Sequence, residues 1–543
     1  MRRWPGWTGV LFAVAFYCLS FTPSLVPRTW ALQAVAAGVT AAAGYGVGAF
    51  LGCAARRCGL RPGERLVRIG RLALAVLGTA GVVAVTARSV TWQGDMRRAV
   101  GMDPRIPWWQ WLLVPFVALV LSALIVLLAR ALRLGTRALA RLLERVIPRQ
   151  VALAGAAALV TVVVVGIVQG FLLRGLLAVA ESSASLANSS TTAGIVRPVL
   201  PTLSGSPSSL ETWPSLGSKG RDFVGRASTK ADIAAFTGRP AMDPIRVYVG
   251  LKSAPTLHER AELAVRELER TGAFRRKVLV VFGTTGSGWV NENLAKPLEY
   301  MYGGDSALVT VQYSYLPSWI SFLTESEAAD AGRSLFDAVY AHWSTLPAAQ
   351  RPKLYVSGES LGSFASEKAF DGKLSEMVAR SDGALLVGPT LQNPMWEQIG
   401  RDRDPGSQLW LPVYQDGRSV RFARRAPDLQ SPPAPWPSPR IVYLQNGSDP
   451  VTWWSPDLLG SSPAWLDRPR APDVSPDMQW YPLVTFWQVT CDLAGADGVP
   501  VGYGHRFGTL PVAAWAAVSQ PPGWTAADTT RLERRLEAQQ EPH

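Results

Sequence analysis

Five long apolar stretches fill the first third of this 543-residue chain. Each approaches the ~20 residues that a helix needs to cross the ~30 Å hydrocarbon core of a bilayer. Several of them carry no charged residue, whereas a helix of a soluble protein would show a polar face. We therefore expect an N-terminal all-α transmembrane bundle of about five helices in residues 1–175. The stretches run over residues 7–25, 30–52, 69–87, 111–128 and 151–173.

The first stretch has two interpretations. Arg2 and Arg3 precede it, as they would in the basic start of a secretory signal peptide. The stretch is long for a signal peptide and other spans follow it, which favours a retained helix. Pro23 and Pro27 interrupt it, so it is the weakest of the five spans.

The positive charge of the chain lies in this membrane half. Residues 1–175 hold 20 Arg, no Lys and 4 acidic residues, a net charge of +16, so the other 34 basic and 37 acidic residues sum to −3. Charge confined to the loops between apolar stretches indicates membrane topology and argues against nucleic acid as a partner. The expected partners are membrane lipids.

The arginines also predict an orientation. The loops over residues 53–71 and 130–149 hold six Arg each, and the alternate loops hold one and four. The positive-inside rule then places the N-terminus and the two richer loops in the cytoplasm. With five spans, the chain after Leu173 lies outside the cytoplasm. The run over residues 130–149 is either a helix on anionic lipid headgroups or a simple basic loop.

The rest of the chain predicts an α/β-hydrolase domain joined through a linker. Residues 176–240 are rich in Ser, Thr, Gly and Pro, which is typical of a linker or a wrapping segment. In residues 241–520, short Val-, Leu- and Ile-rich runs alternate with amphipathic segments, which predicts a mostly parallel sheet with helices on both faces. We expect an insert near 389–439 and a polar tail over 521–543. The strand-like runs cover residues 245–250, 277–282, 306–312, 353–357, 383–387 and 440–444.

A G-x-S-x-G motif predicts the nucleophile. Gly358 and Gly362 flank Ser360, a strand-like run precedes them and a helix-like segment follows. A strand, a sharp turn and a helix form the context in which α/β-hydrolases hold a nucleophilic serine. The alternative is a Gly-rich turn without chemistry.

A catalytic serine needs a base, and His505 is the best of the four histidines. It lies in a glycine-flanked loop after the last strand-like run, and the chain order of this enzyme class requires the histidine to come last. His258 and His342 fall in helical segments, and His543 is the last residue. Asp449 follows the strand-like run 440–444 and is the candidate acid, although an aspartate before Pro450 also suits a structural turn.

Acyl transfer also needs two N–H donors for the oxyanion. The backbone of Leu361, directly after the nucleophile, is one candidate. The other lies in the Gly-rich loop 283–289, at Thr284 with Thr285 as a further candidate. A phosphate-binding loop is disfavoured because no Lys follows the last glycine. Trp289 and Trp453 flank these loops and are candidate substrate contacts, the alternative being that they only pack in the core.

The chain resembles the bacterial membrane-anchored alpha/beta-hydrolase family 9, whose members carry a separate N-terminal membrane domain. The resemblance covers nearly the whole chain and implies that Ser360, Asp449 and His505 occupy the triad positions. It fixes the type of reaction better than the substrate. The stretches that carry it are Ser24-Leu25-Val26-Pro27-Arg28, Tyr248-Val249-Gly250-Leu251, Arg270-Thr271-Gly272-Ala273-Phe274, residues 283–290, residues 358–362 and Ser448-Asp449-Pro450-Val451.

The sequence therefore predicts a membrane-bound serine hydrolase that cleaves acyl esters of lipids or the cell envelope. An acyltransferase would use the same triad, and a non-catalytic membrane scaffold would keep only the fold. Peptide cleavage uses the same three residues. No metal or organic cofactor is indicated, since the four cysteines lack a cluster with zinc-ligand spacing.

Overall fold

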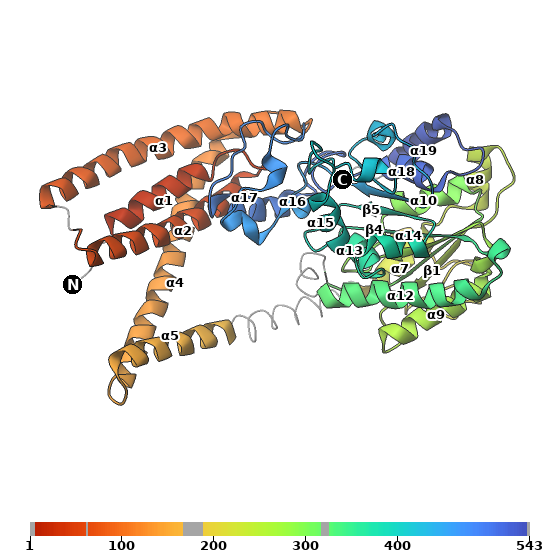
Figure 1. Cartoon of the computed structure of the whole chain (residues 1–543), viewed down its shortest axis with the longest axis horizontal. Helices are drawn as coiled ribbons and strands as arrows, with labels where there is room; N and C mark the ends of the chain where they lie inside the picture. Colours follow the sequence, from red (N-terminus) through yellow and green to blue (C-terminus); the bar gives the residue numbers. More distant parts are fainter. Residues whose placement is uncertain (1–5, 61–62, 167–187, 317–324, 540–543) are drawn as a thin grey trace. The chain divides into compact units, whose positions relative to one another are not determined.

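The structure is a computed structural model that describes residues 6–60, 63–166, 188–316 and 325–539 (Figure 1). The chain divides into two compact units. The first contains Met1–Leu176 and Gly447–His505, and the second contains Leu177–Asn446 and Arg506–His543. A segment that the sequence assigned to the catalytic domain, Gly447–His505, thus packs with the N-terminal helices.

The N-terminal part of the first unit is helical. Within the described part of the chain, four helices are long and apolar enough to cross a membrane, by length and composition: Trp30–Arg57, Glu64–Ala99, Trp108–Leu143 and Arg149–Gly166. They correspond to α2 (Trp30–Arg57), α3 (Glu64–Ala99), η1 (Trp108–Leu113) with α4 (Val114–Leu143), and α5 (Arg149–Gly166).

The first and fifth predicted spans differ from the helices. α1 (Trp7–Leu19) has 13 residues and ends before Pro23, so it is shorter than the predicted stretch 7–25. Residues 167–173 of the fifth stretch lie outside the described residues. The number of spans and their orientation therefore stay predictions.

The segment Gly447–His505 adds short helices to the first unit. They are α16 (Pro450–Trp453), η7 (Pro456–Leu459), η8 (Ala464–Leu466), α17 (Val484–Asp492) and η9 (Leu493–Gly495). α17 contacts α2 (Figure 1). The helical part of this unit has its own buried cluster, which includes Tyr17, Phe21, Trp111 and Val114.

A seven-stranded parallel sheet forms the centre of the second unit, in the order β1-β3-β2-β4-β5-β7-β6. Its strands are apolar and almost wholly buried, as expected of a sheet that is covered on both faces. Six of the strands match the predicted runs. The strands are β1 (Ile245–Val249), β2 (Val278–Gly283), β3 (Ser306–Val311), β4 (Lys353–Glu359), β5 (Gly383–Val387), β6 (Val420–Ala423) and β7 (Arg440–Leu444).

Helices flank the sheet on both faces, which confirms the predicted fold class (Figure 1). α9 (Leu257–Thr271), α12 (Glu325–Thr345) and α13 (Leu361–Lys368) pack together on one face. α10 (Glu292–Met301), α18 (Leu510–Ser519) and α19 (Ala526–Gln539) pack together on the other. The other helices described in this unit are α7 (Gly217–Gly225), α8 (Lys230–Thr237), η3 (Ala273–Arg275), η4 (Ala348–Gln350), α14 (Leu374–Arg380), α15 (Pro394–Arg401), η5 (Gln415–Gly417) and η6 (Ala426–Gln430).

Three segments contain helices or a strand that their composition did not predict. The wrapping segment contains α7 and α8, whose Phe223 and Phe236 join the core of the sheet domain. The insert 389–439 contributes β6 to the sheet edge. The polar tail contains α19, whose Leu532 and Leu536 are buried in the same core.

Candidate active site

Ser360 occupies a sharp turn between β4 and α13. Its backbone angles are φ 56° and ψ −123°, a region that non-glycine residues rarely adopt. The turn is held because the N–H of Ser360 donates to Val387 O at 2.9 Å, while Ser360 O accepts the N–H of Ser363 at 2.9 Å. The side chain is only partly buried. This is the strained strand-turn-helix geometry of a nucleophile elbow.

Glycines let the turn pack directly on neighbouring backbone. A Cβ placed on Gly358 would lie 2.2 Å from Gly362 O, and one on Gly362 would lie 2.4 Å from Gly283 O. Neither position has room for a side chain. The two motif glycines therefore bring the elbow against the end of β2, where the Gly-rich loop begins.

The predicted oxyanion donors lie on the two sides of this contact. Leu361 is the first residue of α13, so its N–H is one of the first-turn donors that lack an acceptor within the helix. Thr284 follows β2, and its carbonyl carbon lies 3.3 Å from a Cβ built on Gly362. The N–H of Thr285 donates to Trp289 O at 3.2 Å. Thr285 therefore closes the turn of its own loop, and Thr284 remains the candidate donor.

Two buried side chains hold the Gly-rich loop in place. Gln312 Nε2 donates to Ser287 O, and the hydroxyl of Tyr248 donates to Gly288 O, both at 2.9 Å. Neither residue lies in a sequence pattern that predicts such a contact. The YVGL stretch at Tyr248 contributed to the family resemblance, but nothing in it indicated a contact 40 residues away.

Asp449 and His505 form a hydrogen-bonded pair within the first unit. His505 Nδ1 lies 2.7 Å from Asp449 Oδ2, and the carboxylate is fully buried. Asp449 Oδ1 also accepts the N–H of Val451 at 2.9 Å, and Asp449 Oδ2 accepts the hydroxyl of Thr452 at 3.2 Å. The turn role weighed from the sequence is thus present, and the same side chain also contacts His505, while its role as the catalytic acid stays a prediction.

A second buried carboxylate fixes the histidine loop. Asp473 Oδ2 accepts both the N–H and the hydroxyl of Ser448, at 2.9 and 2.8 Å. The Ser448 oxygen in turn accepts the N–H of Gly504 at 3.0 Å. Ser448 and Gly504 directly precede Asp449 and His505, so this bridge aligns the two loops. Asp473 could not be recognised from the sequence, because it lies in an irregular Pro-rich segment.

The predicted site residues fall into two groups. The first unit brings Asp449 together with His505. The second unit holds Ser360 and brings Leu361 and Thr284 to one place. Among residues 6–60, 63–166, 188–316 and 325–539, no three His, Cys, Asp or Glu side chains group as a metal site.

The two candidate tryptophans differ in exposure. Trp289 is 38% exposed at the Gly-rich loop, so its ring is accessible to a substrate. Trp453 is 3% exposed, and its ring centroid lies 6.0 Å from that of Trp465. These are the surroundings of a packing residue, and a role of Trp453 as a substrate contact stays a prediction.

Glu367 lies buried on α13, behind the nucleophile. Burial raises the pKa of its carboxyl to about 7, although hydrogen bonds from Tyr443, Asn393 and the backbone of Met395 favour the charged form. Asn393 Nδ2 also donates to Ser363 Oγ at 3.1 Å, and Ser363 Oγ donates to Ser360 O at 2.7 Å. A buried carboxyl is thus connected to the backbone of the elbow.

Comparison with known proteins agrees with this architecture. Residues 21–227 match the family described as "Alpha/beta-hydrolase family N-terminus". Neither the curated proteins nor the solved structures gave a match. Residues 245–532, more than half of the chain, match the "Alpha/beta-hydrolase family". The chain therefore belongs to this alpha/beta-hydrolase family, with the N-terminal domain that accompanies it.

Proposed function

We propose that the protein is a membrane-bound serine hydrolase that cleaves acyl esters, with Ser360 as nucleophile, His505 as general base and Asp449 as its orienting acid. The strained elbow at Ser360 carries the proposal. A serine with φ 56° has an energetically unfavourable backbone conformation, and a catalytic role explains why the fold keeps it. The 2.7 Å contact between Asp449 and His505 supports it independently.

The proposed reaction has two halves. Ser360 Oγ attacks the ester carbonyl carbon while His505 Nε2 takes the hydroxyl proton, and the N–H groups of Leu361 and Thr284 stabilise the oxyanion. The carbon–oxygen bond to the alcohol then breaks, and His505 gives its proton to the leaving oxygen. Water attacks the resulting acyl-serine with His505 again as base, which releases the acid and restores the serine.

The substrate class follows from the surroundings of the site. The chain carries apolar helices of membrane-spanning length, which would keep the enzyme at a lipid surface. Trp289 offers an exposed aromatic ring at the end of the Gly-rich loop 283–289. Both features support an apolar acyl chain in a membrane lipid or another ester of the cell envelope.

Labelling by a fluorophosphonate tests the proposal. Detergent-purified wild type is expected to react, and Ser360→Ala is expected not to react. Ser366→Ala is the matched control, since Ser366 lies on the same helix and its hydroxyl only donates to Ser357 O. A folded wild-type protein that stays unlabelled would favour the scaffold hypothesis.

The same triad would serve an acyltransferase, and the fate of the acyl group distinguishes the two. Radiolabelled acyl chains should appear as free acid in the presence of alcohols, sugars or lipids as acceptors. Recovery of the label on an added acceptor would instead show that the protein is an acyltransferase.

A further inference from the structure

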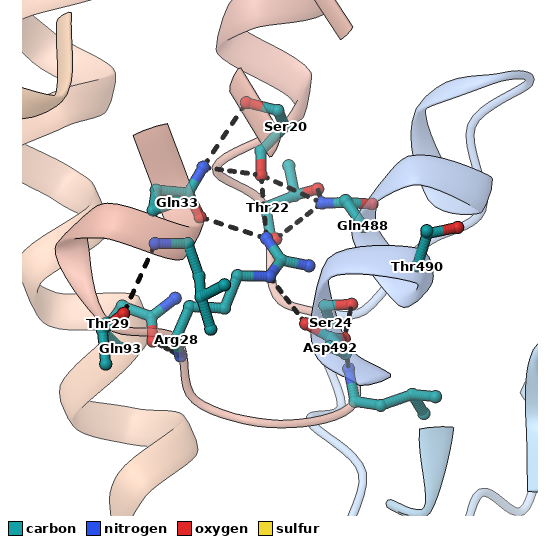
Figure 2. A network of polar contacts seen from close by, with 12 residues as sticks. Ser20, Thr22, Ser24, Arg28, Thr29, Gln33, Gln93, Gln488, Thr490 and Asp492 are labelled. Carbon is teal, nitrogen blue, oxygen red and sulfur yellow. Dashed lines mark hydrogen bonds and ion pairs between the residues drawn. The ribbon is translucent and has the colours of Figure 1, made fainter. Parts of the chain in front are cut away.

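The Ser24–Arg28 stretch, part of the family resemblance, has no role in the reaction proposed above. The loop that contains it follows α1, and its Arg28 is almost completely buried. Arg28 Nε donates to Asp492 Oδ1 at 2.6 Å, and both side chains are at most 1% exposed (Figure 2). A buried ion pair is costly to break, because either partner alone would be an uncompensated charge.

Further hydrogen bonds complete the network around Asp492. The hydroxyl of Ser24 and the N–H of Leu25 both donate to Asp492 Oδ2, the latter at 3.0 Å. Arg28 Nη1 also donates to Gln33 Oε1 at 3.0 Å, and the N–H of Arg28 donates to Gln93 Oε1 at 2.8 Å. The carboxylate at the end of α17 is therefore bound by three groups from a loop more than 460 residues earlier.

A second residue of α17 binds the same loop. Gln488 lies one helical turn before Asp492, on the same side of the helix. Its Nε2 atom donates to Ser20 O at 3.2 Å and to Thr22 O at 3.0 Å (Figure 2). One face of α17 is thus fixed to the chain between α1 and α2.

The loop also reaches the residues next to His505. Val26 is fully buried and packs in a small cluster with Val499 and Tyr503. The N–H of His505 donates to Ala496 O at 3.0 Å, and Ala496 lies four residues after Asp492. The loop therefore contacts the segment from Asp492 to His505 at two places. Ser24 and Arg28 bind its first residue, Asp492, and Val26 packs on Val499 and Tyr503 nearer to His505.

We propose that the Ser24–Arg28 loop of the N-terminal domain is a positioning element for the catalytic base. Through Asp492 and Val499 it sets the place of the His505 loop, while Asp473 and Ser448 fix the same loop from the Asp449 side. The N-terminal domain is then a working part of the active site as well as an anchor. This inference rests on the proposed role of His505.

Two variants of different severity separate positioning from folding. Ser24→Ala removes one hydrogen bond to Asp492, and Asp492→Asn removes the charge. Ser89→Ala is the matched control, since Ser89 is equally buried in the same unit but its hydroxyl donates only to Thr86 O. The measurement is the second-order rate of fluorophosphonate labelling as a function of pH, at equal folded protein. We expect Ser24→Ala and Asp492→Asn to slow labelling about tenfold or more and to move its pH midpoint, and Ser89→Ala to do neither.

A spectroscopic measurement tests the same inference without activity. The chain has four histidines, so the His505 ring signals can be assigned in ring-labelled protein by comparison with His505→Asn. We expect Ser24→Ala to shift the His505 Nδ1 signal and Ser89→Ala to leave it in place. Unchanged labelling and an unchanged His505 signal in folded Ser24→Ala and Asp492→Asn would overturn the inference. Failure of the wild type to label would instead contradict the proposed function, and the ring signal would still decide the positioning role.

Discussion

His505 Nδ1 lies 2.7 Å from the fully buried carboxylate of Asp449, while the imidazole itself remains 11% exposed. A carboxylate that accepts the Nδ1 proton fixes the ring tautomer and leaves Nε2 as the basic nitrogen. Because Asp449 also binds the first turn of α16, one side chain orients both the ring and the loop around it.

Asp449→Asn should remove the correct tautomer without removing the turn. The amide keeps an oxygen for the N–H of Val451, but it would present an N–H group to the imidazole. We expect ester cleavage to fall by about 10³- to 10⁴-fold with little change in the melting temperature. Asp457→Asn, which changes an exposed aspartate in η7, should retain activity. Equal activity of Asp449→Asn and wild type would contradict the assigned role.

Gly362→Ala should disturb both halves of the oxyanion site. Its Cβ would lie 2.4 Å from Gly283 O, a backbone atom that cannot swing away. We expect a loss of about 1–3 kcal/mol in the free energy of unfolding and a much lower labelling rate. Thermal melting and fluorophosphonate labelling measure the two effects. Gly460→Ala is the control, because a Cβ there meets nothing within 4 Å.

Glu367 should make stability depend on pH. Its pKa is raised by burial to about 7 from an ordinary value of 4.5, so the folded state binds this proton more tightly than the unfolded state. Protonated Glu367 therefore contributes to the free energy of unfolding. This contribution is complete below about pH 4.5 and is lost as pH rises through about 7, a change of about 3 kcal/mol. Melting temperatures across this range should fall less steeply in Glu367→Gln than in wild type. The exposed Glu397→Gln should follow the wild-type curve, and parallel curves for all three proteins would contradict the prediction.

The two tryptophans should respond differently to replacement by alanine. Trp289→Ala should raise KM for esters with long acyl chains and leave stability almost unchanged, because the ring is exposed. Trp453→Ala should lower the free energy of unfolding by about 3–5 kcal/mol, since it removes a buried ring that packs on Trp465. Kinetics with short and long esters and thermal melting make the comparison. A stable Trp453→Ala with raised KM would instead support Trp453 as a substrate contact.

The arginine distribution predicts that the catalytic domain lies outside the cytoplasm. A C-terminal fusion to a phosphatase that is active only outside the cytoplasm should therefore be active. A fusion to a protein that fluoresces only in the cytoplasm should stay dark. The opposite pair of results would reverse the orientation derived from the arginine-rich stretches at 53–71 and 130–149.

Local patterns predicted much of the fold and the elbow. Ser360 was identifiable because a nucleophile elbow depends on consecutive residues, from the end of β4 to the start of α13. The six buried runs were recognised as strands because each is a short stretch of consecutive apolar residues. Weakly apolar β6 and amphipathic α19 were missed, because the neighbours that bury them come from distant parts of the chain.

The residues that position Asp449 and His505 could not be predicted from local patterns. Arg28 and Asp492 are 464 residues apart, and neither lies in a pattern that indicates a partner. Asp473 follows Pro472 in an irregular segment, so the sequence alone cannot show that it binds Ser448. His505 was selected because three other histidines were less suitable, and its contact with Asp449 became visible only in the folded chain.

The most direct test is the mass of a trapped acyl-enzyme. Wild type mixed with an activated long-chain ester and quenched in acid should carry one acyl group on the peptide that contains Ser360. The His505→Asn variant should accumulate far less, and Ser360→Ala should carry none. An ester cleaved at the wild-type rate by Ser360→Ala, or an acyl group on a different residue, would contradict the assignment of Ser360 as nucleophile.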